Sequence, residues 1–178
     1  MTRSRVFLLR GPLRVAAKHY GQSRRDHRVG PGWDRGLGAP VGSLLAGPQK
    51  FIEQARVYRK ALGGGMRQAG ILAAAGLIAL EKGPARLHVD HANAVFLAEG
   101  LAQLDGIKID PASVQTNILV FDISGTGMNS ADLTRRLAEK NVLCSGISAE
   151  AVRIVTHLDI SRGDCEQALT AIRAVLKH

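Results

Sequence analysis

The chain has 178 residues, of which 46% are hydrophobic and 22% are charged. This composition fits one ordinary globular domain or two small ones, and it excludes a disordered chain, collagen and a disulfide-rich scaffold. The formal net charge is +9, but residues 1–35 carry +7 of it and the rest of the chain only +2. The basic character therefore belongs to the N-terminal segment, and the remainder is close to neutral.

The N-terminal segment, residues 1–35, is rich in arginine and poor in acidic residues, as organellar transit peptides are. Two other interpretations compete with targeting. The segment could be a disordered basic tail, or sequence foreign to the fold that arose from an altered start or reading frame. Within residues 1–28, only the aromatic residues Phe7 and Tyr20 alternate with the arginines. We therefore expect no specific nucleic-acid partner and at most non-specific contact with phosphates.

A continuous uncharged and largely apolar run of 13 residues covers residues 68–80. A membrane span needs about 20 such residues, so this run predicts a buried helix and no membrane segment. The two cysteines, Cys144 and Cys165, have no metal-binding spacing. They indicate reduced thiols, and we expect a cytoplasmic protein.

The middle of the chain predicts a helical connector. Residues 36–47 alternate glycine with small apolar residues, which favours two short strands, or one strand and an extended loop. Pro48 can open a helix in which apolar residues recur at helical spacing as far as Leu62, and the glycine triplet 63–65 ends it. Two further helices are expected, over residues 66–81 and 85–104.

The last third of the chain predicts a small α+β layer. Strands are expected at 117–123, 141–144 and 152–156, with one helix after the first strand and another after the last. Asn129 with Asp132, and Ser161 with Asp164, have the spacing of helix N-terminal caps. This order builds a sheet that two helices cover on one side.

Two glycine-rich segments are candidates for binding. The first is residues 34–43, where glycines would let a planar ligand or another chain approach the backbone; a tight turn is the simpler alternative. The second is residues 59–68, where Lys60 and Arg67 flank the glycine triplet just before a helix. That arrangement could bind a phosphate or carboxylate, or it could be a helix end with solvated cations.

A third candidate segment is residues 152–160. Arg153 opens a strand whose apolar neighbours would hold its guanidinium still, and a guanidinium held in this way can clamp a carboxylate. His157 and Asp159 are two residues apart, hence expected on one face of a strand. A structural histidine is the simpler interpretation of His157, since no nucleophile is near it in sequence.

Together these segments resemble one family. The runs GLGAPVGSLLAG (36–47), RKALGGGMRQAGILAAAGLIAL (59–80), DHANAVFLAEGLA (90–102) and VRIVTHLDIS (152–161) resemble the C-terminal part of low-specificity L-threonine aldolases. These are pyridoxal-phosphate lyases of the aspartate-aminotransferase-like fold. They cleave threonine or allo-threonine to glycine and acetaldehyde, generally as homotetramers whose active sites draw residues from neighbouring subunits.

The resemblance implies an α/β fold that is part of a pyridoxal-phosphate-dependent transferase-like fold. Residues 36–105 would be the end of the large-domain sheet and the connecting helices, and residues 106–178 the small C-terminal α+β domain; residues 1–35 would be the basic leader. It also implies roles for three cations. Arg153 would bind the substrate carboxylate, Lys60 would lie at the edge of the active site, and Arg67 would approach the cofactor near a subunit boundary.

The chain departs from the family at the cofactor. The family has Ser-Lys before Gly-Leu-Gly-Ala-Pro, and that lysine forms the Schiff base with pyridoxal phosphate, but here the two positions hold Asp34 and Arg35. A guanidinium stays protonated and delocalised, so Arg35 cannot form the imine, although it could still contact the cofactor. The family's N-terminal half also has no counterpart before residue 36.

From these departures we expect a truncated relative that is a threonine-aldolase-like lyase by family and inactive as this chain. The alternative is a non-enzymatic module. An apolar surface that normally faces the missing half would drive oligomerisation, or pairing with a full-length paralogue.

Overall fold

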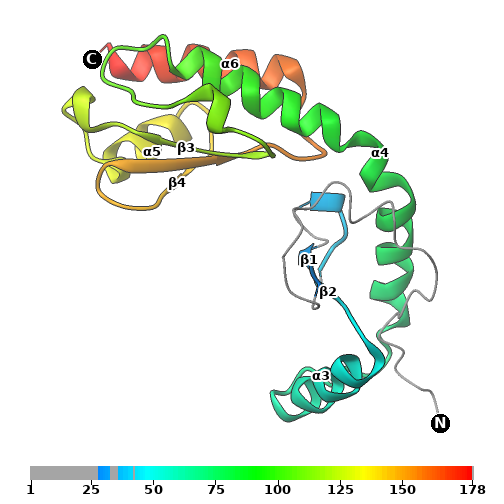
Figure 1. The fold of residues 1–178 in the computed structure, drawn as a ribbon. Coiled ribbons are helices and arrows are strands. Elements are labelled where there is room, and N and C mark those ends of the chain that lie inside the picture. Colours follow the sequence, from blue (N-terminus) through cyan, green and yellow to red (C-terminus); the bar gives the residue numbers. More distant parts are fainter. Residues whose placement is uncertain (1–27, 33–35, 42, 178) are drawn as a thin grey trace. The chain divides into compact units, whose positions relative to one another are not determined.

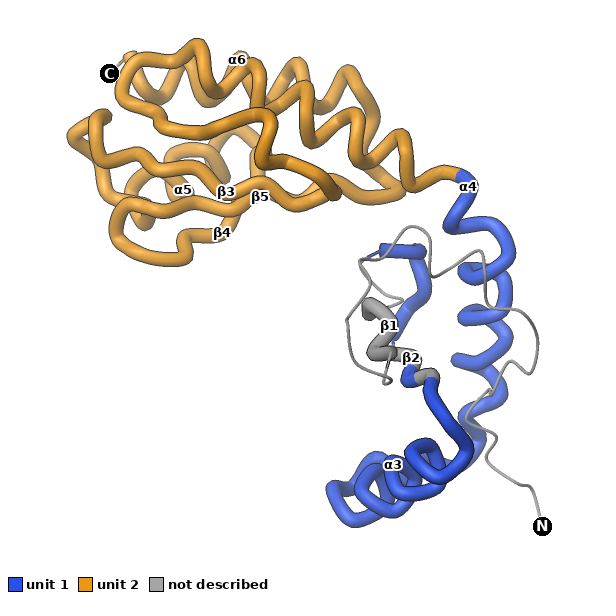
Figure 2. Tube along the Cα trace, in the orientation of Figure 1, with its two compact units in different colours: residues 1–85 blue, residues 86–178 orange. Residues whose placement is uncertain are grey.

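The computed structural model describes residues 28–32, 36–41 and 43–177 (Figure 1). Contacts divide the chain into two compact units, residues 1–85 and residues 86–178 (Figure 2), and each is described by itself below. The expected division at residues 35 and 105 was drawn from the resemblance rather than from contacts, and it remains a prediction.

The first unit contains a two-stranded antiparallel sheet. Strand β1 (Arg28–Gly32) pairs with strand β2 (Ser43–Ala46), and Arg28 lies opposite Ala46. The predicted strand within residues 36–47 is therefore confirmed at its C-terminal end. Its partner is β1, in the segment expected to be a leader, whereas Gly36 and Leu37 are helical.

Helix α3 (Gln49–Ala61) starts after Pro48, as predicted. Its burial differs from the prediction, because Ile52 is its only buried residue while Tyr58 and Leu62 are 60% and 86% exposed. The helix ends in a Schellman motif, in which Gly64 N–H donates to the Arg59 carbonyl at 2.8 Å and Gly63 N–H to the Lys60 carbonyl at 3.2 Å.

Helix α4 (Gly70–Leu101) is one helix of 32 residues where two were predicted. It begins later than expected, because Gln68 has a φ of 51°, outside the helical range. Pro84 removes one backbone donor from its interior, yet the helix continues. The preceding Gly83 is buried, and a Cβ there would lie 2.8 Å from Leu37 Cδ2, so close packing surrounds this turn. The boundary between the two units falls inside α4, after Ala85.

The second unit is built on a three-stranded antiparallel sheet in the order β3-β5-β4. Strands β3 (Ile118–Asp122) and β5 (Ala151–Val155) confirm two predicted strands. The prediction of a strand at 141–144 is wrong: β4 is only Ser145–Gly146, and Asn141 has a φ of 60°, which interrupts extended backbone. Short 3₁₀ turns, η1 (Pro111–Ser113) and η2 (Ser124–Thr126), flank β3.

Both remaining helices begin at the predicted caps. Helix α5 (Ser130–Ala138) is capped by Asn129, whose side chain accepts from Asp132 N–H at 2.8 Å. Helix α6 (Arg162–Leu176) opens with a capping box between Ser161 and Asp164. Because these side chains satisfy amides that the first helical turn leaves free, the two helix starts are fixed locally.

One hydrophobic core holds the second unit together. Helices α5 and α6 and the C-terminal part of α4 pack on one face of the sheet, as the predicted one-sided layer requires (Figure 1). The strands bury Leu119, Phe121, Val152 and Ile154, and the helices bury Leu97, Leu101, Leu133, Leu137, Leu169 and Ile172. The opposite face of the sheet is open, since Ile118 and Val120 are 46% and 48% exposed.

Candidate functional site

Arg153 lies in the middle of the open face of the sheet. Strand β5 alternates buried and half-buried side chains, and Arg153 points away from the core with Ala151 and Val155. Val120 is its neighbour on β3 and Ser145 its neighbour on β4. Extended backbone and cross-strand pairing thus place a cation on a largely apolar surface.

The Arg153 guanidinium has no protein counter-charge in the described part of the chain. Its Nε is buried and forms no hydrogen bond there. A buried donor without a partner is unfavourable, and an arginine fork satisfies it best with the two oxygens of a carboxylate. The geometry therefore suits Arg153 to the carboxylate contact that the resemblance implies.

Lys60 and Arg67 belong to the first unit and lie on either side of the glycine triplet. Both are exposed, Lys60 in the last turn of α3 and Arg67 in the bend before α4. No acidic residue occurs from residue 54 to residue 80. The segment is locally basic, as an anion contact requires.

Arg35, which the resemblance places where the family has its Schiff-base lysine, lies outside the described residues, as does the basic segment 1–27. The cofactor can still be tested against the lysines that the structure describes. All of them are exposed: Lys50, Lys60, Lys82, Lys108, Lys140 and Lys177. Covalent capture of pyridoxal phosphate needs an amine held in a water-excluding site. The residues described do not fit a covalently held cofactor.

His157 and Asp159 lie together, but not on a strand. Strand β5 ends at Val155, and the two residues belong to the turn that follows. His157 Nδ1 is 3.6 Å from the Asp159 carboxylate, and both side chains are largely exposed. The prediction that both residues lie on one face of a strand is therefore wrong.

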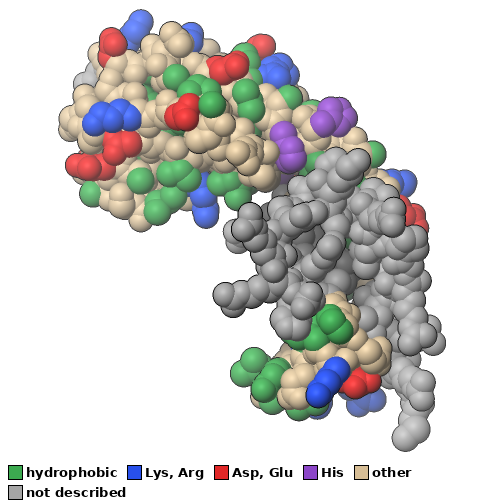
Figure 3. Space-filling view, viewed as in Figure 1, with side chains coloured by type: hydrophobic (Ala, Val, Ile, Leu, Met, Phe, Trp, Pro, Cys, Tyr) green, Lys and Arg blue, Asp and Glu red, His purple; other side chains and the backbone are tan. Residues whose placement is uncertain are grey.

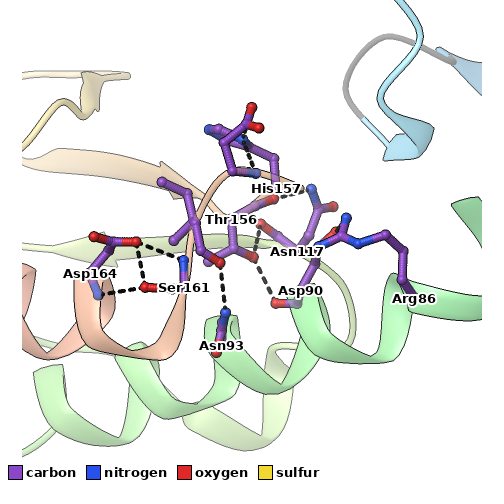
Figure 4. A network of polar contacts seen from close by, with 10 residues as sticks. Arg86, Asp90, Asn93, Asn117, Thr156, His157, Ser161 and Asp164 are labelled. Carbon is purple, nitrogen blue, oxygen red and sulfur yellow. Dashed lines mark hydrogen bonds and ion pairs between the residues drawn. The ribbon is translucent and has the colours of Figure 1, made fainter.

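A buried polar network anchors this turn to α4 (Figure 4). The Thr156 hydroxyl donates to the Asp90 carbonyl at 2.7 Å, and Asn117 Nδ2 donates to the Thr156 carbonyl at 2.8 Å. Farther along, Asn93 Nδ2 donates to the Ile160 carbonyl at 3.1 Å. Three chain segments are thereby held together where β5 leaves the sheet.

An ion pair supports the same network. Arg86 donates two hydrogen bonds to Asp90, at 3.0 and 3.1 Å, and Asp90 is 2% exposed. Sequence reasoning missed this feature. The sequence did contain a signal, because Asp90 and Asn93 occupy core-facing positions of a helix. Polar side chains in a protein core are almost always hydrogen-bonded, so the two residues predict a buried polar network.

Hydrogen bonds also lower the pKa of a carboxyl group at each of two turns. The Ser161 hydroxyl and amide both donate to Asp164, and they lower the pKa of that carboxyl below its ordinary 3.8. Ser124 lowers the pKa of Asp122 in the same way. Burial raises the pKa of the Cys144 and Cys165 thiols above 9.0, so neither cysteine is an activated nucleophile.

Other kinds of site were sought in the described ranges. No group of three metal-binding side chains occurs there, and none of the helices described is both long and apolar enough to cross a membrane. An open hollow lies between α4 and α6, with Phe96 and Leu169 at its apolar part and Glu99, Glu166 and Arg173 at its charged part. It includes none of the cations discussed above.

Comparison with known proteins gives a family match over more than half of the chain. A model of the beta-eliminating lyase family matches residues 29–124. Low-specificity L-threonine aldolase 1 from Arabidopsis thaliana is 41% identical over 143 residues, and low specificity L-threonine aldolase from Escherichia coli strain K12 is 44% identical over 142. Each match covers 80% of this chain and 40% of the relative, so the chain spans about two fifths of their length.

Solved structures support the fold. A candidate L-allo-threonine aldolase from Listeria monocytogenes matches with a TM-score of 0.62 at 18% identity, covering 84% of this chain and 44% of that one. A candidate aromatic amino acid beta-eliminating lyase/threonine aldolase from Exiguobacterium matches with the same TM-score at 19% identity. The predicted α/β class and partial transferase-like fold are confirmed.

Proposed function

The chain belongs to the beta-eliminating lyase family, and from this premise we propose that it is a threonine-aldolase-like member that binds an amino acid through Arg153 without carrying out cofactor-dependent cleavage. Pyridoxal phosphate is the family's cofactor, and its chemistry there is the stabilisation of negative charge on the substrate carbon. The substrate class, threonine and related 3-hydroxy amino acids, is taken from the names of the relatives.

The observation that carries the proposal is the state of Arg153. Its Nε is buried without a partner on a surface formed by Val120 and Ser145. A carboxylate that accepted from this guanidinium would satisfy the orphaned donor and neutralise its charge. The apolar side chains beside Arg153 would restrict its rotation and so fix the direction of the bound carboxylate.

The loss of cleavage rests on Arg35. An arginine cannot supply the amine that the family's lysine supplies, and each lysine described is exposed to water. Lys60 and Arg67 would still contact an anionic group non-covalently, because the segment around them contains no acidic residue to neutralise them.

Titration with glycine and threonine, followed by NMR of the arginine Nε–H signals, tests the carboxylate contact. We expect the Arg153 signal to move with both amino acids, and the shift to disappear in Arg153→Gln. Arg173→Gln is the matched control, since Arg173 is an exposed arginine of α6 in the same unit. An Arg153 signal that does not respond to either amino acid would contradict the proposal.

A second candidate function, self-association, is supported by the exposed apolar side chains of the first unit. Leu62 and Ile71 are 86% and 81% exposed, and Val57, Tyr58, Met66 and Ile78 are each at least 55% exposed. Figure 3 shows hydrophobic side chains at the surface around α3. We propose that a second copy of the chain covers them, as in a homo-oligomer, with a full-length paralogue as the alternative partner.

Light scattering during size-exclusion chromatography tests this candidate. We expect an oligomer whose mass falls towards that of the monomer in Leu62→Gln/Ile71→Gln. A monomer at every concentration of the unchanged chain would contradict self-association.

Cell fractionation tests the predicted cytoplasmic location, which the two free cysteines support.

A further inference from the structure

Different physical constraints explain why glycine occupies each of the three positions between α3 and α4. Gly63 has a φ of 83°, a conformation that the Schellman motif requires and that glycine adopts without strain. Gly64 and Gly65 lie outside the left-handed region. Backbone conformation alone does not require glycine at these two positions, so the reason must lie in what surrounds them.

At Gly65 the surrounding group is Lys60. A Cβ on Gly65 would lie 2.7 Å from Lys60 Cδ and 3.2 Å from Lys60 Nζ. The first distance is shorter than side-chain carbons ever approach one another, so the Lys60 side chain occupies the space beside the Gly65 Cα. Gly64 has the same relation to Arg59, whose Cγ is 2.9 Å from the position of the absent Cβ.

Electrostatics explains why Lys60 folds back over this loop. Lys60 is in the last turn of α3, where the negative end of the helix dipole attracts a cation. Arg56, Arg59 and Arg67 are close in sequence, and no acidic residue occurs from residue 54 to residue 80, so a lysine without a fixed path would turn away from these cations into water. The bare Cα of Gly65 gives the side chain a path that stays against the helix end.

We propose that Gly65 is a positioning residue for Lys60: because it has no side chain, it holds the lysine amine over the loop that joins α3 to α4. Its importance for ligand binding rests on the proposed function, in which Lys60 contacts an anionic group. The positioning itself is a property of the free protein, so it can be tested without any ligand.

Gly65→Ala in the full chain is the direct test. The atoms nearest to the added methyl group belong to the flexible end of Lys60, so we expect the variant to fold with an unchanged circular dichroism spectrum. Gly70→Ala is the matched control, since no atom lies within 4 Å of a Cβ at Gly70. In NMR spectra of the unchanged chain, we expect a nuclear Overhauser effect between Lys60 Hδ and Gly65 Hα.

In Gly65→Ala the Lys60 side-chain signals should shift, and in Gly70→Ala they should not. Inorganic phosphate supplies the second measurement: its affinity at Lys60 should fall at least about threefold in Gly65→Ala, as expected when a cation leaves a helix end. The proposal is overturned if the Overhauser effect is absent from the unchanged chain, or if Gly65→Ala leaves the Lys60 signals in place. If those signals shift but phosphate binds neither protein, the anion contact fails and the positioning stands.

Discussion

The two compact units bury their apolar side chains to different extents. The second unit encloses a core shared by its sheet and the helices packed on one face, with Leu101, Leu133 and Ile172 each 0% exposed. In the first unit α3 buries Ile52 alone, and Leu62 and Ile71 remain largely in water. The second unit therefore encloses a hydrophobic core of its own, whereas the first leaves several large apolar side chains exposed.

The comparison also separates the two kinds of site. In the second unit Arg153 is placed by a sheet whose core is complete, and a buried polar network fixes the end of its strand. In the first unit Lys60 is placed by a helix end and by the space beside a glycine. Rigid packing positions the first cation, and a local backbone motif positions the second.

The largest expected effect is that of removing a core side chain from the second unit. Leu133→Ala should lower the free energy of unfolding by about 2–5 kcal/mol, because the side chain is fully buried and would leave a cavity. Leu62→Ala, the same substitution at an exposed leucine of the first unit, should change the free energy of unfolding by no more than about 0.5 kcal/mol in the monomer. Urea denaturation measures both. Equal effects of the two substitutions would contradict the difference in burial between the two units.

A smaller effect is expected from the buried network. Thr156→Val keeps the shape of the side chain but removes its hydroxyl donor to the Asp90 carbonyl, so it should lower the free energy of unfolding by about 1–3 kcal/mol. Thr170→Val removes a hydroxyl from the exposed face of α6 and should change stability by less than about 0.5 kcal/mol. Denaturant titration gives the free energy of unfolding of both variants. Equal values would show that the buried network does not contribute to stability.

Smaller again is the cap of α6. Ser161→Ala should destabilise the second unit by about 1 kcal/mol at neutral pH. The Ser161 hydrogen bonds lower the pKa of Asp164 below 3.8, so its carboxylate stabilises the fold above that pH and loses this contribution as the pH falls through the lowered value. Thermal unfolding at a series of pH values should show the difference between the wild-type chain and Asp164→Asn shrinking in acid. A stability difference that grew in acid would contradict a stabilising role for the ionised Asp164 carboxylate.

The sequence predicted those features that depend on local rules. The caps at Asn129 and Ser161 and the glycine end of α3 follow from spacing and residue type, and all three are present. The break expected before residue 85 is absent: α4 continues through Pro84, and the adjacent Gly83 packs closely against Leu37, a contact that local sequence rules do not predict. The apolar stripe of α3 was overestimated, since periodicity shows an amphipathic face but not what covers it.

The candidate site was predicted in its residue types and less well in its surroundings. A cation with apolar neighbours in a strand was enough to single out Arg153, and the pairing of β3, β5 and β4 then supplied its setting. The contacts of Asp90, Thr156 and Asn117 join residues distant in sequence, and no local pattern predicts which of them meet. The roles of Lys60, Arg67 and Arg153 remain predictions.

We expect that this member of the family does not hold pyridoxal phosphate covalently. Incubation with the cofactor, reduction with borohydride and peptide mass spectrometry test it most directly, with threonine cleavage assayed on the same sample. We expect no pyridoxyl adduct at any lysine and no formation of acetaldehyde. An adduct on one defined lysine, together with conversion of threonine to glycine, would contradict it.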